Sequence, residues 1–192
     1  MKPTRTSLLV TAALLLATAY AHAAEPGNPW PATRAGQPAP KIAGMPPELA
    51  RNLANADDLD FRVYSRQQWQ DMHKSHAHDV VAYWPDGHST KGLEKHIQDV
   101  QWMFTFAPDA RVTEHPVRFG TNDAEWTVVT AWVEGTFSKP MTLPDGSTIQ
   151  PTGKAFRIPM ATIGHWNKQG SMSEEYLFLD NSALMQQIGV GK

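Results

Sequence analysis

The sequence predicts an α+β domain in which a curved antiparallel sheet wraps around helices. Helical patterns dominate the chain up to about residue 109, and strand-like runs fill most of the chain after it. That order is typical of an α+β fold, in which helices and strands come from separate parts of the chain, and not of alternating βαβ units. Two long runs of alternating apolar residues, 156–166 and 172–180, flank a short turn at 167–170 and form the clearest hairpin of the chain.

Residues 1–23 have the features of a secretory signal peptide. Lys2 and Arg5 provide the positive start, residues 8–19 the apolar core, and Ala21 to Ala23 a cleavage site of small residues. The apolar core is shorter than the roughly 20 residues that span a bilayer. We therefore expect a cleaved signal, a periplasmic or secreted protein and no membrane anchor.

The rest of the chain is long enough for one domain and contains no cysteine, so its stability must come from packing. Removing the two basic residues of the signal leaves 15 of the 17 lysines and arginines against 19 aspartates and glutamates. No basic run is long enough to follow a phosphate backbone. We therefore expect no nucleic-acid partner.

Residues 24–58 are predicted to combine a flexible leader with a short helix. Seven prolines between positions 26 and 47 favour extended, solvated backbone, and residues 48–56 have a helical pattern. A second helix is expected to begin at Ser65, with Ser65 as N-cap and Gln68 as its reciprocal partner, and to end near Ser75.

The central part of the chain predicts a strand, a tight turn and an amphipathic helix. The strand covers 79–84, the turn is Pro-Asp-Gly at 85–87, and the helix follows Gly92 and ends at the Ala-Pro-Asp of 107–109. Further strands are expected at 111–119, 125–137, 156–166 and 172–180, with a last helix over 182–188.

Several short motifs follow one another in an order that is similar to a known family. They are YWPDG at 83–87, APD at 107–109, GTFSKPM at 135–141, PTGKAF at 151–156 and EEYLFLDN at 174–181, followed by MQQIGV. Together they resemble the SnoaL-like polyketide cyclase or ester cyclase family of the nuclear transport factor 2-like (NTF2-like) superfamily. The resemblance covers about residues 59–190 of the domain expected at 59–192.

The resemblance implies a cone-shaped α+β barrel with a pocket for a small molecule, and a homodimer formed through the open sheet. It also implies catalysis without a cofactor, by acid/base chemistry that closes a ring through an intramolecular aldol step. In such enzymes an aspartate near the end of the last strand, assisted by a histidine on the preceding strand, handles the proton. Asp180 and His165 are the residues of this chain at those places.

Each candidate catalytic residue has two interpretations. Asp180 is a general base, or simply the N-cap of the helix that follows it. His165 is a proton donor or acceptor, although strict alternation places it opposite the apolar lining of its strand. Tyr176 polarises a carbonyl group if its strand turns Asp180 inward, and the same phase turns Glu174 inward and Glu175 away.

Other residues are expected to line a pocket for a flat or cyclic ligand, because aromatic side chains beside a lone acid suit such compounds. These residues are His88, Trp126, Trp132, Glu134, Phe156, Met160 and Phe178. Alternation alone leaves open which face of each strand lines the pocket.

A group of histidines near the second helix raises the question of a metal site. His76 and His78 form a His-x-His pair with His73, Asp86 and His88 nearby in sequence, but the glutamate expected a few residues after such a pair is missing. Solvated histidines explain the pattern better, and we predict no metal and no other cofactor.

Taken together, these features predict an exported enzyme of the SnoaL-like type that performs cofactor-free acid/base chemistry on a small apolar carbonyl compound. The alternative is a non-catalytic module that binds a small molecule or forms a dimer.

Overall fold

The computed structural model describes residues 32–143 and 145–190. The predicted signal peptide, residues 1–23, lies outside the described residues. Within those two ranges, no helix is both long enough and apolar enough to cross a membrane.

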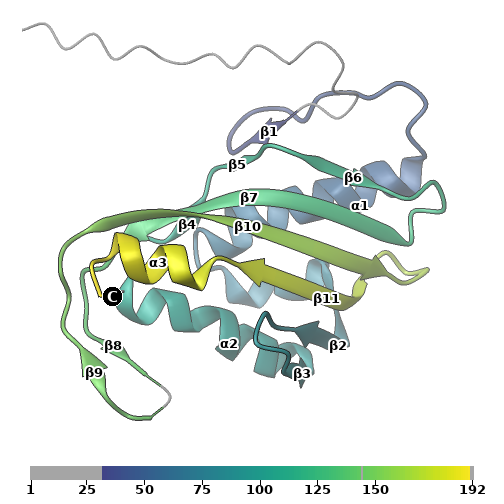
Figure 1. Ribbon diagram of the computed structural model, residues 1–192. Helices are drawn as coiled ribbons and strands as arrows, with labels where there is room; N and C mark the ends of the chain where they lie inside the picture. The colour runs from purple at the N-terminus through teal and green to yellow at the C-terminus, as the bar shows by residue number, and fades with distance from the viewer. Residues whose placement is uncertain (1–31, 144, 191–192) are drawn as a thin grey trace, which may run out of the picture.

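The domain is built on one curved sheet of seven strands, which are labelled in Figure 1. Its main path has the order β3-β2-β11-β10-β7-β4, and β6 pairs with β7 beside β4. Neighbours are antiparallel except β2 and β11, which run parallel. The strands are β2 (His76–Tyr83), β3 (Ser89–Lys91), β4 (Arg111–Val112), β6 (Arg118–Gly120), β7 (Trp126–Thr136), β10 (Ala155–Trp166) and β11 (Met172–Leu179).

Helices cover the concave face of this sheet. α1 (Pro47–Asp58) packs on β6 and β7, α2 (Leu93–Phe106) packs on β2 and β3, and α3 (Asn181–Gln187) packs on β10. Between α1 and β2 the chain forms a π-helical segment, η1 (Leu59–Tyr64), and a 3₁₀ helix, η2 (Trp69–Lys74). The expected α+β fold, with a curved sheet packed on helices, is confirmed, but among the described residues the sheet stays open and forms no closed barrel.

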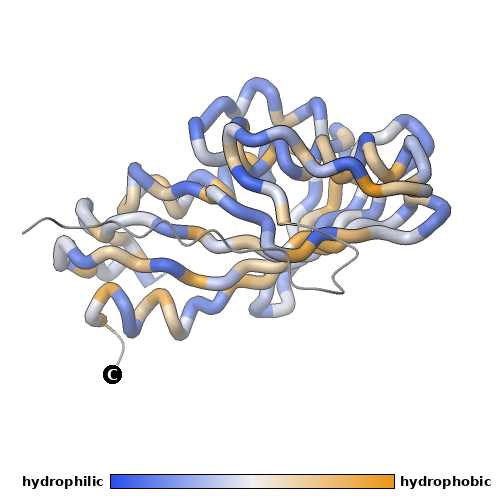
Figure 2. Tube along the Cα trace, turned by 90° about the horizontal axis from the view of Figure 1, so that it is seen from above, coloured by the Kyte–Doolittle hydropathy of each residue, from blue (hydrophilic) through white to orange (hydrophobic). Residues whose placement is uncertain are grey.

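Alternation along the strands separates an inner from an outer face, and hydrophobic and hydrophilic residues alternate along the traces in Figure 2. On β7 every second residue from Thr127 to Gly135 is buried. Phe156 and Ile158 of β10 point to the same side, where they pack with Phe106, Phe137 and Leu184 in the largest apolar cluster. The inner face is therefore the core side.

Three predictions of local structure were wrong. Ser65 does not begin a helix: its hydroxyl donates to the Asp60 carbonyl at 2.6 Å and closes η1, and the next helix is the short η2. The strand expected at 111–119 is broken into β4, β5 (Glu114–His115) and β6. The proline-rich leader is not wholly free, because β1 (Thr33–Arg34) pairs with β5.

A buried histidine joins this N-terminal segment to the domain. The ring of His115 is fully buried, with Nδ1 2.8 Å from Asp57 Oδ1 and Nε2 2.9 Å from Asp60 Oδ2. Thr33 donates its hydroxyl to the same Asp57 oxygen at 2.9 Å, and Arg118 lies 3.3 Å from the other oxygen. Burial alone would lower the pKa of His115, but the hydrogen bonds to Asp57 and Asp60 outweigh it and raise that pKa above 6.5.

This arrangement predicts how stability changes with pH. A histidine with a raised pKa in the folded state stabilises the protein fully below the unfolded pKa and loses that contribution as pH rises through the folded pKa. The free energy of unfolding of the wild type should therefore fall more between about pH 6 and about pH 9 than that of His115→Gln. Urea unfolding at both pH values measures the difference. The exposed His73→Gln serves as control, and an equal pH dependence in wild type and His115→Gln would contradict the assignment.

Candidate functional site

A cavity of about 750 Å³ lies between the concave face of the sheet and the helices. Its walls are mostly apolar and come from η1, η2, α2, β11, the short strand β8 (Met141–Thr142) and α3. β8 pairs with β9 (Thr148–Ile149) in a hairpin beside the sheet. The apolar lining includes Leu59, Trp69, Met72, Val100, Met103, Leu177, Leu179 and Leu184. A cavity of this size suits a small, largely apolar compound.

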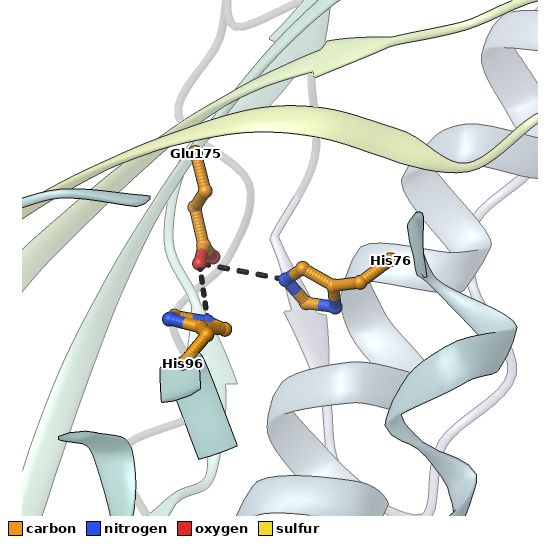
Figure 3. A group of neighbouring side chains, drawn as sticks. All are labelled: His76, His96 and Glu175. Atoms are coloured by element: carbon orange, nitrogen blue, oxygen red, sulfur yellow. Dashed lines mark hydrogen bonds and ion pairs between the residues drawn. The ribbon is translucent and has the colours of Figure 1, made fainter. Parts of the chain in front are cut away.

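One polar cluster interrupts these apolar walls. Glu175 of β11 meets His96 of α2 and His76 of β2, as Figure 3 shows. The Oε2 atom of Glu175 lies 2.8 Å from His96 Nε2 and 3.4 Å from His76 Nε2. All three residues are at most 3% exposed. Glu175 and His96 border the cavity, so this buried triad is the candidate active site.

Local backbone features bring the three side chains together. Gly92 precedes α2 with a φ of 97°, a left-handed conformation that glycine adopts without strain, and its carbonyl accepts the amide of His96 at 3.0 Å. The pairing of β11 with β2 shifts register between Met172 and Glu174. Met172 is buried, and after the shift Glu175 also points inward.

Electrostatics keep Glu175 ionised. Burial by itself would raise the pKa of its carboxyl, but the charge and hydrogen bonds of His96 and His76 outweigh burial, and the pKa falls well below its usual range. The buried Nδ1 atom of His96 has no hydrogen-bond partner within the described part of the chain, whereas Nδ1 of His76 lies 2.9 Å from Ser75 Oγ. His96 thus has one ring nitrogen within hydrogen-bond distance of Glu175, and its other ring nitrogen makes no hydrogen bond to the described residues.

Further polar groups border the same cavity. Burial, together with the charge of Asp60, raises the pKa of Tyr64, so its phenol keeps its proton and remains a hydrogen-bond donor. Asp60 is held by His115, and Asp99 pairs with Lys95. These groups can position polar atoms of a ligand.

The sequence-predicted catalytic residues lie elsewhere. Asp180 is exposed and is the N-cap of α3, accepting the amide of Ala183 at 2.8 Å. It borders a smaller depression of about 410 Å³ together with Trp132, Met160 and Phe178. The expectation that Asp180 enters the main cavity and Glu175 points away was wrong, because the strand turns its odd-numbered residues Glu175, Leu177 and Leu179 inward.

His165 and Tyr176 lie on the outer face of the sheet. The ring of His165 stacks on Trp126 with centroids 4.3 Å apart, and its Nδ1 lies 3.6 Å from Glu174. The Tyr176 hydroxyl donates to Glu174 at 2.9 Å, and this bond raises the pKa of Tyr176 to about 12. Neither residue lines the main cavity, and strict alternation along β10 had already placed His165 opposite the apolar lining.

The expected pocket residues divide between the two faces. His88 and Met160 line the main cavity. Phe156 belongs to the core, and Phe178 is 48% exposed on the outside. The outer face also carries Trp126, Trp132 under the Arg157 guanidinium at 4.0 Å, and Glu134, which pairs with Arg111 at 3.1 Å.

Sequence reasoning missed His96 and Glu175 and paired His76 with the wrong partner. His78 is exposed, so the His-x-His pair does not converge. One signal was present: His96 falls three residues after Leu93 and four before Val100, within the apolar stripe of its helix.

Comparison with known proteins gives one family and a consistent fold. The family model described as SnoaL-like polyketide cyclase matches residues 57–188. Among solved structures, a protein from Jannaschia sp. CCS1 named as a SnoaL-like polyketide cyclase has a TM-score of 0.62 at 19% identity, over 77% of this chain and 97% of that chain. A protein from Xanthomonas campestris pv. campestris named as a polyketide cyclase has a TM-score of 0.63 at 14% identity, over 74% and 99%.

A third similar structure is IdmH from Streptomyces antibioticus, also named as a polyketide cyclase. Its TM-score is 0.61 at 19% identity, over 72% of this chain and 99% of that chain. At these identities the likeness to solved structures shows the fold alone. No curated protein matches the sequence.

The capping role of Asp180 predicts a specific pattern of stability. Asn accepts the Ala183 amide about as well as Asp does, so Asp180→Asn should unfold within a few tenths of a kcal/mol of wild type, whereas Asp180→Ala should lose about 1 kcal/mol. Urea unfolding of the three proteins measures both values. A large loss in Asp180→Asn, or none in Asp180→Ala, would contradict the capping role.

Proposed function

The chain belongs to the SnoaL-like polyketide cyclase family, and on this premise we propose that it is a cyclase-type enzyme using acid/base chemistry on a small, mostly apolar carbonyl compound. The observation that carries this proposal is the buried 2.8 Å pair of Glu175 and His96 at the wall of a 750 Å³ apolar cavity. A paired carboxylate and imidazole beside a largely apolar cavity is a usual arrangement for moving a proton.

The geometry supports distinct roles for the two residues. Ionised Glu175 accepts the Nε2 hydrogen of His96, so a neutral His96 ring carries its lone pair on Nδ1. Nδ1 then takes a proton from the carbon next to a substrate carbonyl, and the electron pair moves to the carbonyl oxygen. Tyr64, which keeps its own proton, donates a hydrogen bond to that oxygen.

Ring closure completes the proposed reaction without an external reactant. The enolate carbon attacks a second carbonyl of the same molecule and forms the new carbon–carbon bond. Protonated His96 returns its proton to the alkoxide that results, so the dyad ends the cycle as it began it. This sequence uses only groups that border the cavity.

The same proposal includes the location of the protein and its assembly. The predicted signal peptide at 1–23 supports a periplasmic or secreted location, where the substrate would be an extracytoplasmic compound. The exposed outer face of the sheet, with Phe178 at 48% and Val117 at 38%, supports a homodimer formed through that face.

A second candidate function is a binding module that holds a small molecule without converting it. The same apolar cavity supports it, because the cavity alone suffices for binding. The two functions differ in whether a bound carbonyl compound exchanges its protons.

The acid/base proposal predicts the effect of removing either member of the dyad. With 2-tetralone as a small apolar probe ketone in D₂O, the protein-dependent exchange of its acidic protons, followed by proton NMR, should fall at least about 100-fold in His96→Gln and in Glu175→Gln. His165→Gln, on the outer face, should exchange at the wild-type rate.

Binding is measured separately by the fluorescence of tryptophans that border the cavity, Trp69, Trp84 and Trp102. Probe binding with no exchange above the buffer rate would favour the binding module. Wild-type exchange in His96→Gln would rule out the dyad.

A further inference from the structure

The buried triad contains one more side chain than proton transfer requires. Acid/base chemistry uses Glu175 and His96, yet His76 adds a second imidazole to the same carboxylate oxygen, 3.4 Å away. Two imidazole nitrogens and one carboxylate oxygen are ligands that divalent first-row transition metals prefer.

We propose that His76, His96 and Glu175 form a binding site for a divalent transition-metal ion. The three ligand atoms lie within 4.8 Å of one another. Two ligands of a tetrahedral ion bound at about 2.05 Å are about 3.3 Å apart, and the two distances to Glu175 Oε2, 2.8 and 3.4 Å, fall on either side of that value.

Burial and charge also favour an ion at this place. Glu175 is 3% exposed, and across residues 32–143 and 145–190 its ion pairs are those with His76 and His96. An imidazole compensates a buried carboxylate only when it is protonated, whereas a divalent ion does so directly. An ion at this place therefore supplies positive charge directly to the buried carboxylate.

The surroundings of the triad provide a second shell and an entry route. Ser75 Oγ lies 2.9 Å from His76 Nδ1 and orients the ring so that Nε2 faces Glu175. Glu175 and His96 border the cavity, so an ion can enter there and keep open coordination positions on that side. Three protein ligands with open positions are typical of a site that also binds a small molecule.

Metal binding goes beyond the proposed acid/base function, and the two uses of the triad exclude each other. An ion bound to Glu175 and His96 leaves neither residue free to move a proton. The metal-free protein is therefore the acid/base form, and the loaded protein is inhibited for that chemistry.

The test is isothermal titration of the untagged, EDTA-stripped protein with Zn²⁺. Wild type should bind one ion saturably. The variants His76→Gln, His96→Gln and Glu175→Gln should each weaken binding by at least about tenfold, because even changes outside the ligand set typically cost about 10- to 100-fold in affinity. Ser75→Ala should weaken it by a similar factor while leaving all three ligands in place. Mg²⁺, which prefers oxygen ligands, should not bind there.

His78→Gln is the matched control, because His78 lies on the same strand but is exposed. It should bind Zn²⁺ like wild type, and circular dichroism should show that each variant is folded. No saturable binding by wild type, or binding unchanged in folded His76→Gln and His96→Gln, would overturn the metal site. Equal weakening in His78→Gln would do the same.

The two proposals fail in different ways. Proton exchange by the metal-free protein with no Zn²⁺ binding would overturn the metal site and leave the acid/base function standing. Zn²⁺ binding with wild-type exchange in His96→Gln would overturn the acid/base function alone. If both hold, saturating Zn²⁺ should abolish the exchange.

Discussion

A carboxylate buried in the middle of the fold needs partners where it lies, and Glu175 imposes that constraint on two distant segments. Its partner His76 is 99 residues away in sequence and lies on the parallel neighbour strand, while His96 comes from a helix that packs on that strand. Removing one partner from a buried ionic cluster costs several kcal/mol, since the remaining charge stays buried and uncompensated. The register of β2 against β11 and the position of α2 on the sheet therefore determine whether the buried triad forms.

A second buried charge cluster supports another part of the cavity wall. His115 connects Asp57 of α1 to Asp60 of η1, and Asp60 borders the cavity. Thr33 joins this cluster from β1, so a segment before the first helix reaches the wall of the site through three hydrogen bonds, Thr33 to Asp57, Asp57 to His115 and His115 to Asp60. Two polar clusters thus border the cavity, and each contains buried histidine, His76 and His96 in one and His115 in the other.

Much of the fold was predictable because its signals are local. The apolar spacing of α2, the Pro-Asp-Gly turn and the alternation of β7, β10 and β11 led to elements within a few residues of those observed. The site was not, because β11 carries large apolar residues on both faces, Leu177 and Leu179 inside and Tyr176 and Phe178 outside. Alternation cannot choose between such faces, and the choice had rested on Asp180. Which histidines meet depends on the pairing of strands far apart in sequence, which no local pattern records.

The energetic cost of the site is met during folding and not when a ligand binds. Glu175 and His96 are already stripped of water and paired in the folded protein, so an entering compound displaces solvent mainly from apolar walls. Dipoles and charges fixed in this way need little reorganisation as charge develops on a bound molecule, and the low dielectric around them strengthens their effect. The same fixed geometry also means that only one occupant can use the triad at a time. A proton, a substrate atom and a metal ion all compete for the same preformed nitrogen and oxygen atoms.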